Sequence, residues 1–583
     1  MKPARFLAPL LLAACRASSG TESAPPAAPP TPAAVEYTVA LATQPELAVR
    51  FTVSAPASAD GTTVFGVDAS WGGVDDAADA ILDVAASGAG GKPLAVEKTS
   101  SHEWSVRAPA GERIAASWRV APNAHQHDSN PRVHYHTLFD AGLLHFIGHL
   151  GLLTPLRVDG SLRSRVVFRW VGFAEAGWTV ATSFGVDPRG FDVEASFDEL
   201  RHAVYLAAPD LRVYRAPVRG REVTVAIAGH SWPFSDAEFV KDVRAIVETE
   251  RAFFDDDDFP YYLVSVIPVG EADPHSRSLG GTGLTRSFAC FLHPDTPIGD
   301  SGESGLGVPH LLAHEMFHHW NGGVAGMEEN EQLVYWFSEG FTEFYARRLL
   351  HRAGFGGLEE TARSLNEALK EYALSPVVAA PNEKIREGFW SDRELQRLPY
   401  LRGDLVAILL DHEIRTRSHG ARSLDDFFRE VVAHGREGGK LGTSALLGRI
   451  ASWTDAAFAE RVRSIVVDGT PVVLDAATFE PCLELGSESL GAYELGFDLD
   501  ASRAAKEIRG VTPGSAAADA GLRNGQRLTS VNITYGNPET PVEVGVRDDE
   551  GDRKLRWLPQ GDRLPVPRVK LRDGAASADC AWL

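Results

Sequence analysis

Residues 314–320 read His-Glu-Met-Phe-His-His-Trp, and the residues around them are mostly apolar. On a helix, side chains four residues apart lie on the same face, so the imidazoles of His314 and His318 converge while Glu315 is carried beside them. The apolar neighbours predict that this helix is buried. Two converging imidazoles with an adjacent carboxylate predict a zinc site in which Glu315 polarises a bound water.

A second helix pattern follows at 336–343, which reads Trp-Phe-Ser-Glu-Gly-Phe-Thr-Glu. Its Glu339 stands among aromatic residues, where a carboxylate is costly to bury unless a positive charge neutralises it. Zinc in catalytic sites commonly takes two histidines and one glutamate and leaves the fourth position to water. We therefore expect His314, His318 and Glu339 to bind one zinc ion, with Glu315 as the general base.

The length of 583 residues predicts about two to four domains rather than a single core. With 44% hydrophobic and 23% charged residues, the composition is that of an ordinary globular protein. The net charge of −22 argues against a nucleic-acid or anionic-membrane surface, because binding to phosphates needs clustered lysine and arginine. No nucleic-acid partner is expected.

The N-terminus has a basic start, Met-Lys-Pro-Ala-Arg, then an apolar run from Phe6 to Ala14, then Cys15. This order is typical of a secretion signal, and the run is too short to span a bilayer. Leu-Ala-Ala-Cys at 12–15 resembles the bacterial lipobox, which implies that residues 1–14 are removed and that Cys15 is acylated. The resemblance implies a lipid anchor in the bacterial cell envelope, in the periplasm or at the outer-membrane surface. The alternative is a plain secretion signal.

Residues 15–35 are rich in proline, alanine, serine and threonine, so they predict an extended tether without a core. Three further cysteines follow, at Cys290, Cys482 and Cys580. In an oxidising compartment Cys482 and Cys580 are expected to pair, which leaves Cys290 buried. Spacing along the chain does not settle this pairing, because it carries no distance.

The pattern changes twice after the tether, and the fold class expected is multidomain α+β. Residues 36–221 show short alternating runs between Gly, Pro, Asp and Ser turns, which predict an antiparallel β domain of sandwich type. Residues 222–475 show strands and then helix patterns, which predict a mixed domain with a helical lobe around the motif helices. The acidic run at 255–258 is expected to be a solvated loop.

Residues 476–583 resemble a PDZ domain. The segments that carry the resemblance are Leu495, Gly496 and Phe497, Pro-Gly-Ser-Ala-Ala at 513–517, and Ala-Gly-Leu-Arg-Asn-Gly at 520–525. The resemblance implies that a peptide's carboxyl end adds a strand to a sheet edge while N–H groups of the first segment hold the carboxylate. The alternative is a module that only packs against the rest of the chain.

The motif at 314–321, the helix pattern at 336–342 and the PDZ-like module together resemble the glycyl aminopeptidase family of gluzincin metallopeptidases, with aminopeptidase N as a more distant relative. The resemblance implies a β domain, a thermolysin-like catalytic domain with a helical lobe, and one Zn²⁺ per chain. Pro-Tyr-Leu-Arg-Gly at 399–403 looks like the Tyr-x-Lys-Gly segment of related aminopeptidases, which makes Tyr400 the expected hydrogen-bond donor to the oxyanion. The alternative is an ordinary half-buried tyrosine.

Glu343 lies one turn beyond Glu339 on the same helix face, where it either orients a zinc histidine through the second ring N–H or faces solvent. Relatives carry a Gly-Gly-Leu-Glu-His-type edge strand whose glutamate holds the α-amine of a peptide. Here the corresponding residues are Gly280, Gly281 and, in place of the glutamate, Gly283. The glycines are expected to let the strand pair with substrate, but the anchor for the amine is missing.

The motifs together predict a zinc-dependent peptidase with aminopeptidase-like activity on a peptide or protein substrate. Two alternatives stay open: an endopeptidase of the same fold, and a non-catalytic surface-tethered protein that binds peptides or proteins through the PDZ-like module. Glu315 favours catalysis, because a scaffold needs ligands but no base. Gly283 leaves open which end of a peptide, if either, the site reads.

Overall fold

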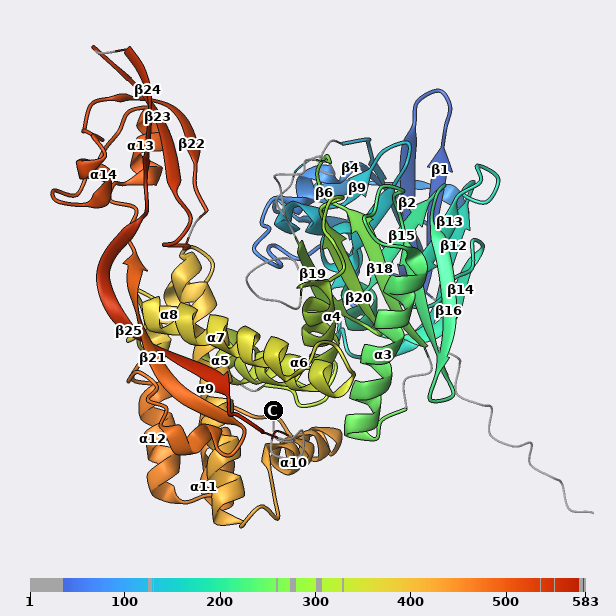
Figure 1. Ribbon diagram of the computed structural model, residues 1–583. Helices are drawn as coiled ribbons and strands as arrows, with labels where there is room; N and C mark the ends of the chain where they lie inside the picture. Colours follow the sequence, from blue (N-terminus) through green and yellow to red (C-terminus); the bar gives the residue numbers. More distant parts are fainter. Residues whose placement is uncertain are drawn as a thin grey trace, which may run out of the picture.

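The computed structural model describes residues 35–583 except 124–127, 129–130, 258–260, 273–278, 300–306, 328–329, 535, 550, 576–579 and 581–583. The predicted signal segment 1–14, Cys15 and the tether as far as residue 34 lie outside the described residues. Val35, expected as the end of the tether, already opens the first strand. Figure 1 shows a β-rich part, a central part that combines a sheet with helices, and a C-terminal part on a long ribbon. The predicted multidomain chain of mixed α and β structure is confirmed.

The first part is a β domain whose described residues form three sheets. A seven-stranded sheet, β14-β12-β1-β2-β8-β4-β5, faces two four-stranded sheets, β13-β15-β10-β9 and β11-β3-β7-β6. The elements are β1 (Val35–Ala42), β2 (Ala48–Pro56), β3 (Thr62–Gly66), β4 (Leu82–Ser87), β5 (Pro93–Leu94), β6 (Val96–Lys98), β7 (Glu103–Arg107), β8 (Arg113–Val120), β9 (Leu138–Phe139), β10 (Leu144–Ile147), α1 (Gly148–Gly151), β11 (Thr154–Leu156), β12 (Ser164–Val171), β13 (Thr179–Thr182), β14 (Gly190–Ala195), α2 (Phe197–Arg201) and β15 (Val204–Ala208). Aromatic side chains fill the space between the sheets: the ring of Phe51 lies 5.1 Å from that of Trp118 and 5.3 Å from that of Phe146.

The central part is built on a five-stranded sheet in the order β16-β17-β18-β20-β19. Its strands are β16 (Arg212–Val218), β17 (Arg221–Ile227), β18 (Tyr261–Pro268), β19 (Leu279–Leu284) and β20 (Ser287–Leu292). Both faces are covered: Val225 and Val264 pack against α3 (Asp236–Phe254) and α4 (Gly307–Phe317), whereas Leu263 and Phe291 pack against the β domain. The two edge strands, β16 and β19, each run antiparallel to their neighbour. The domain boundary expected at 221/222 falls inside the hairpin of β16 and β17, so the sheet places it before β16.

A helical region follows α4. Its helices are α5 (Glu331–Ser338), α6 (Gly340–Arg352), α7 (Leu358–Leu374), α8 (Asn382–Gly388), α9 (Arg393–Arg417), α10 (Leu424–Arg436), α11 (Thr443–Trp453) and α12 (Ala456–Val466). A buried ion pair joins α6 to α9, because the guanidinium of Arg347 donates to both carboxylate oxygens of Asp404, at 2.9 and 2.5 Å. Loss of either partner would leave a buried charge uncompensated, so the pair holds the two helices in one register. Across the described parts of the chain, we find no helix with the length and apolar character needed to cross a bilayer.

The C-terminal part is carried on a ribbon of β21 (Leu483–Tyr493) and β25 (Gln560–Leu571) that extends from the helical region (Figure 1). At its far end lie α13 (Leu499–Ala505), α14 (Ala516–Asp519), β22 (Arg527–Asn532), β23 (Val542–Asp548) and β24 (Gly551–Trp557). At its near end Cys482 and Cys580 form a disulfide, with Cα atoms 4.9 Å apart, buried among side chains of the helical region. The predicted pairing is confirmed, and Cys290 is buried as expected.

The acidic run at 255–258 is solvated only in part. The side chain of Asp255 is 95% exposed, but Asp256 is only 6% exposed. Asp256 accepts hydrogen bonds from the indole of Trp320 at 2.9 Å and from the guanidinium of Arg436 at 2.7 Å. The expectation of a solvated loop is therefore wrong for Asp256. Two donors compensate its burial, and they tie the residues after α4 to α10.

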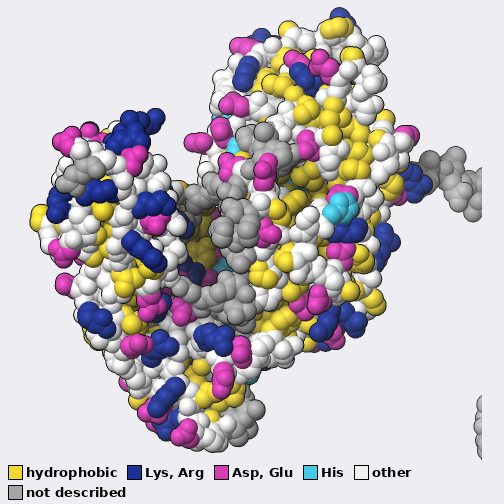
Figure 2. Space-filling model, turned by 45° about the horizontal axis from the view of Figure 1, so that its top comes forward, with side chains coloured by type: hydrophobic (Ala, Val, Ile, Leu, Met, Phe, Trp, Pro, Cys, Tyr) yellow, Lys and Arg dark blue, Asp and Glu magenta, His cyan; other side chains and the backbone are white. Residues whose placement is uncertain are grey.

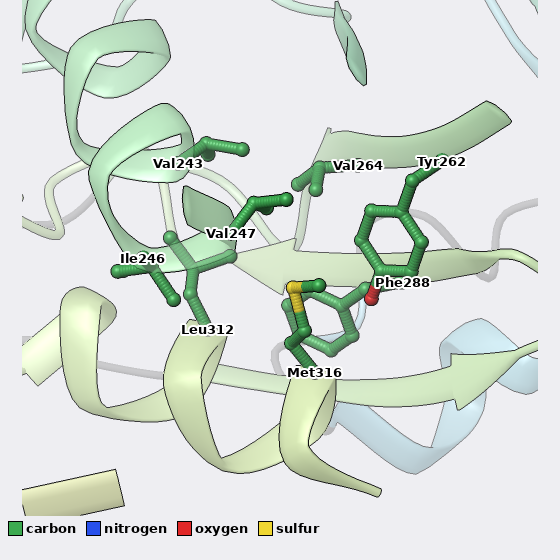
Figure 3. Close-up of a pocket in the computed structure, with 8 residues that line it drawn as sticks. All are labelled: Val243, Ile246, Val247, Tyr262, Val264, Phe288, Leu312 and Met316. Carbon is green, nitrogen blue, oxygen red and sulfur yellow. The ribbon is translucent and has the colours of Figure 1, made fainter. Parts of the chain in front are cut away.

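Behind α4, side chains of α3, α4 and the sheet close around a gap of about 10 Å³, which leaves room for at most one water molecule (Figure 3). The gap is lined by Val243, Ile246, Val247, Tyr262, Val264, Phe288, Leu312 and Met316. On the same helix α3, Glu250 is fully buried, and its carboxylate oxygens have no hydrogen-bond partner among the described residues. Burial raises the pKa of Glu250 well above its ordinary value, so the folded protein carries this side chain protonated.

We expect Glu250→Gln to raise the melting temperature, and the gain to grow from pH 5 to pH 8. The pKa of Glu250 is higher in the folded than in the unfolded protein, so folding retains a proton that the unfolded chain releases above its own pKa of about 4.3. Wild-type stability is therefore lost as pH rises, by up to about 1.4 kcal/mol per pH unit, whereas glutamine does not titrate. Thermal melts of both proteins across this pH range measure the difference, and two parallel curves would contradict the assignment.

Candidate metal centre

The predicted ligand residues converge on one point. His314 lies in the last turn of α4, and His318 follows directly after the helix ends at Phe317. Their Nε2 atoms are 3.1 Å apart, and each lies 3.3 Å from Oε2 of Glu339. Zinc–ligand bonds of about 2.0–2.1 Å at tetrahedral angles hold ligand atoms about 3.3–3.4 Å apart. The three side chains therefore have the spacing and the donor chemistry of a zinc site.

Glu339 reaches this point because it occupies the junction between α5 and α6. Helix α9 packs closely against this junction at two glycines. A Cβ atom on Gly340 would lie 2.3 Å from Cα of Gly403, and one on Gly403 would lie 1.8 Å from the carbonyl oxygen of Trp336. Only residues without a side chain permit this approach. It brings Tyr400, one turn before Gly403, next to the ligands.

Asn321 orients one ligand and fixes the distance between the two motif segments. Its backbone carbonyl accepts a hydrogen bond from Nδ1 of His318 at 3.2 Å, which turns Nε2 toward the other ligands. Its side-chain amide donates to the carbonyl oxygens of Phe337 and Ser338, at 3.1 and 3.0 Å, directly before Glu339. Sequence reasoning gave Asn321 no role, although it is the last residue of the motif at 314–321.

The charges in the site favour a cation between His314, His318 and Glu339. Burial alone would raise the pKa of Glu339, but attraction to His318 and hydrogen bonds from the two imidazoles lower it well below its ordinary value. Burial alone would lower the pKa of His318, but the carboxylate of Glu339 outweighs this effect and raises the pKa to about 9. The carboxylate of Glu339 thus attracts positive charge to the point where the three side chains meet.

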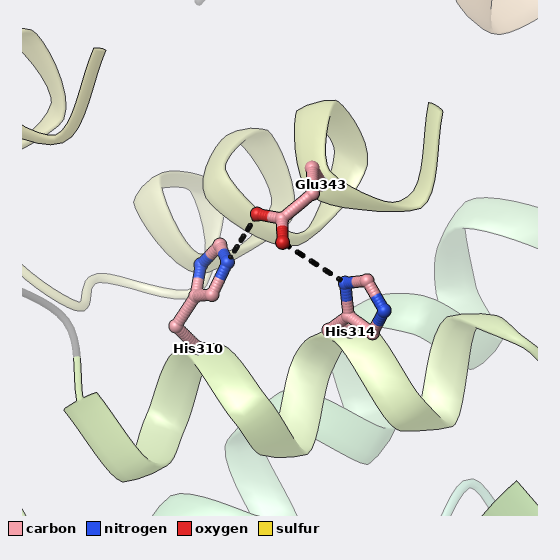
Figure 4. A group of neighbouring side chains, drawn as sticks. All are labelled: His310, His314 and Glu343. Carbon is pink, nitrogen blue, oxygen red and sulfur yellow. Dashed lines mark hydrogen bonds and ion pairs between the residues drawn. The ribbon is translucent and has the colours of Figure 1, made fainter. Parts of the chain in front are cut away.

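Glu343 lies between two imidazoles of α4, His310 and His314 (Figure 4). Its Oε2 is 2.8 Å from Nε2 of His310, and its Oε1 is 3.7 Å from Nδ1 of His314. Arg397 also pairs with Glu343, at 3.2 Å, and a cation so close disfavours a second metal ion. The Glu343 side chain is 16% exposed and faces the back of His314, which is the orienting position considered from the sequence. His310 was not identified from the sequence.

We expect Glu343→Gln to weaken zinc binding by about 10- to 100-fold, because glutamine keeps the shape but loses the charge that supports the His314 ring. Competition with a chromogenic chelator measures the affinity. Glu331→Gln is the matched control, since this glutamate is exposed at the start of α5. Equal affinities of the two variants would rule out the orienting role.

The glycines of β19 lie directly against the candidate base. The backbone N–H of Gly283 donates to Oε2 of Glu315 at 2.9 Å, and a Cβ on Gly283 would lie 3.2 Å from the Glu315 carbonyl oxygen. A Cβ on Gly281 would lie 2.2 Å from the ring of Phe288. The carbonyl oxygen of Gly281 accepts a hydrogen bond from the hydroxyl of Tyr135 at 3.2 Å. Gly280 faces β20, opposite Phe291. Strand β19 therefore packs closely on α4 at Gly283, where a larger side chain would have to displace the Glu315 backbone by a few tenths of an ångström.

Tyr400 stacks on a ligand. Its ring lies 5.9 Å from that of His314, at an interplanar angle of 17°. Burial, with help from the nearby carboxylate of Glu339, raises the pKa of Tyr400 well above 10, so its phenol is neutral and can donate a hydrogen bond. The hydroxyl makes no hydrogen bond to any described residue. This position fits the oxyanion donor expected from the sequence.

The PDZ-like segment at 495–497 is far along the chain from this site, on the C-terminal part. The carbonyl of Leu495 accepts from the Trp557 indole at 3.3 Å, the carbonyl of Gly496 accepts from the backbone N–H of Thr512 at 2.9 Å, and Phe497 is buried. Helix α13 begins at Leu499, where strand addition would need a strand edge. Binding of a peptide's carboxyl end at this segment stays a prediction.

The space-filling view shows a hollow between the C-terminal part and the β domain, with hydrophobic and histidine side chains on its floor (Figure 2).

The chain has the fold of an aminopeptidase N family protein from Idiomarina loihiensis, with a TM-score of 0.70 and 15% identity over 92% of this chain and 98% of that one. An M1 zinc metallopeptidase from Deinococcus radiodurans matches 75% of this chain and 95% of its own, with 19% identity and a TM-score of 0.47. No curated protein matches the sequence.

Residues 308–380 match the family model of the M61 glycyl aminopeptidases. This segment contains the three ligands, the candidate base and Glu343, but it ends before Tyr400. The resemblance to the glycyl aminopeptidase family predicted from the motifs is thereby confirmed.

Proposed function

We propose that this protein is a zinc-dependent peptidase with aminopeptidase-like activity. The observation that carries the proposal is the cluster of His314, His318 and Glu339, whose ligand atoms all lie within 4.8 Å of one another. Glu315 adjoins the cluster and Tyr400 stacks on it, so a base and a hydrogen-bond donor accompany the ligands. The family match of the ligand segment supports the choice of peptide bonds as the substrate class.

A bound zinc ion would supply a Lewis acid that polarises the scissile carbonyl. Glu315 accepts a proton from the attacking water and returns it to the leaving amine. Its hydrogen bond to Gly283 uses Oε2 and leaves Oε1 available for this transfer. The neutral phenol of Tyr400 donates a hydrogen bond to the carbonyl oxygen as that oxygen becomes negative.

The decisive experiment maps cleavage sites in a proteome-derived peptide library, with Glu315→Gln as the blank. Release of single residues from amino termini is the result expected. Internal cuts would contradict the aminopeptidase-like activity and indicate an endopeptidase of the same fold. A protein that binds one zinc ion yet cleaves nothing would overturn the proposal and favour a surface-tethered binding protein.

We expect Tyr400→Phe to lower kcat by about 100- to 1000-fold, the usual effect of losing one donor to a developing oxyanion. Zinc content should stay the same, because Tyr400 contacts His314 through its ring and phenylalanine keeps that ring. Steady-state kinetics together with metal analysis separate these two effects. An unchanged kcat would remove Tyr400 from the mechanism.

We also propose that the mature chain is anchored in the bacterial cell envelope by an acylated Cys15. The support is the basic start, the short apolar run and the lipobox-like residues at 12–15. The disulfide between Cys482 and Cys580 also suits an oxidising compartment. Metabolic labelling with a fatty acid should mark wild type but not Cys15→Ser.

A further inference from the structure

Arg397 contacts two groups of the proposed site at once. It lies one turn before Tyr400 on α9, and its guanidinium carbon is 5.7 Å from the centre of the Tyr400 ring. Its Nη1 lies 3.2 Å from Oε1 of Glu343, the carboxylate beside the ligand His314. Its Nε donates to Oε2 of Glu371 on α7, at 2.9 Å. The guanidinium is thus oriented by Glu371 while it faces Tyr400 and Glu343.

These contacts close a ring around one ligand. The Tyr400 ring stacks on His314 at 5.9 Å, and Oε1 of Glu343 lies 3.7 Å from Nδ1 of the same histidine. Arg397 links the other ends of both contacts. A shift of the guanidinium would therefore change the position of the phenol and of the carboxylate that supports His314.

An exposed ion pair on a protein surface is ordinarily worth about 0–1 kcal/mol, and the Arg397 side chain is 45% exposed. Two features distinguish it from such a pair. Its partner Glu343 is only 16% exposed, so their interaction is less screened by solvent. A guanidinium is also planar and rigid, so it can lie over an aromatic ring while it donates in its own plane.

We propose that Arg397 is a positioning residue that holds the Tyr400 hydroxyl in the direction of the reacting carbonyl and, through Glu343, holds the zinc ligand His314. The part that concerns Tyr400 rests on the proposed function. The part that concerns His314 rests on metal binding alone and stands whether or not peptides are cleaved.

The test compares Arg397→Gln with Arg393→Gln, an exposed arginine one turn earlier on the same helix. We expect Arg397→Gln to lower kcat by about 10- to 100-fold with little change in KM, since a misdirected donor affects the transition state more than binding. Chelator competition should show zinc affinity lowered by up to about tenfold, and Arg393→Gln should match wild type in both measurements.

Two further variants separate positioning from general loss of structure. In a Tyr400→Phe background, Arg397→Gln should have little further effect on kcat, because there is no hydroxyl left to direct. Arg397→Lys keeps the charge beside Glu343 but not the planar group over the ring, so it should restore zinc affinity and not kcat. Melting curves of the metal-free proteins show whether each variant is folded.

Equal and additive losses of kcat in the two Tyr400 backgrounds would overturn the role toward Tyr400. Zinc affinity equal to that of Arg393→Gln would overturn the role toward His314. If wild type cleaves no peptide, the proposed function fails, and the zinc competition alone then decides whether Arg397 positions the ligand.

Discussion

Glu315→Gln should lower kcat by about 100- to 10,000-fold while the protein still binds zinc, because general acid–base catalysis typically contributes that factor. Glutamine has nearly the same shape, and its carbonyl oxygen can still accept the hydrogen bond from the Gly283 N–H. It cannot take a proton from water at neutral pH. The geometry of the site is therefore kept and only the proton transfer is lost.

Stopped assays at saturating substrate, with zinc measured in the same samples, provide the comparison for Glu315→Gln. His318→Ala is the contrasting variant, since it removes a ligand and should lose both zinc and activity. If Glu315→Gln kept the wild-type kcat, another group would be the base and the roles assigned around the metal centre would be wrong.

Loss of the disulfide should produce the largest change in stability. The bond between Cys482 and Cys580 closes a loop with a sequence separation of 98 residues. In the chain-entropy account, closing a loop of this length stabilises the fold by about 4.7 kcal/mol at 25 °C. Both cysteines are buried with the helical region, so their replacement by serine also places hydroxyl groups in an apolar setting.

The double variant Cys482→Ser/Cys580→Ser should therefore melt well below wild type, and reduction of wild type should lower its melting temperature in the same direction. Cys290→Ser is the control, because this buried cysteine forms no disulfide. Its effect on the melting temperature should be smaller, and reduction should lower the melting temperature of this variant as it does that of wild type, because the disulfide is kept. Identical melting curves with and without reductant would show that the bond contributes nothing to stability.

The ligand set was predictable because its spacing is local. His314 and His318 are four residues apart, and Glu339 is marked by the aromatic residues around it. Tyr400 was predictable only through a family resemblance, since one tyrosine in a helix pattern has no chemical signature of its own. The structure supports both by distance.

The residues missed from the sequence share a different property. His310 and Arg397 gain their roles from Glu343, and Asp256 is buried because Trp320 and Arg436 donate to it. These partners come from segments far apart in the sequence, so no local sequence pattern predicts the contacts. From the sequence alone, a charged side chain in such a pattern is predicted to face solvent. Its buried partner is identified only in the packed structure.

The sequence by itself determined which groups meet at the end of α4, because a helical turn places His314, Glu315 and His318 close together. Only the tertiary structure decided what meets them. The contact between Gly340 and Gly403 sets how near α9 comes, and the glycines of β19 set how near the edge strand comes to the base. The reason is that the distance between two packed elements depends on the side chains of both, and these residues lie far apart in the sequence.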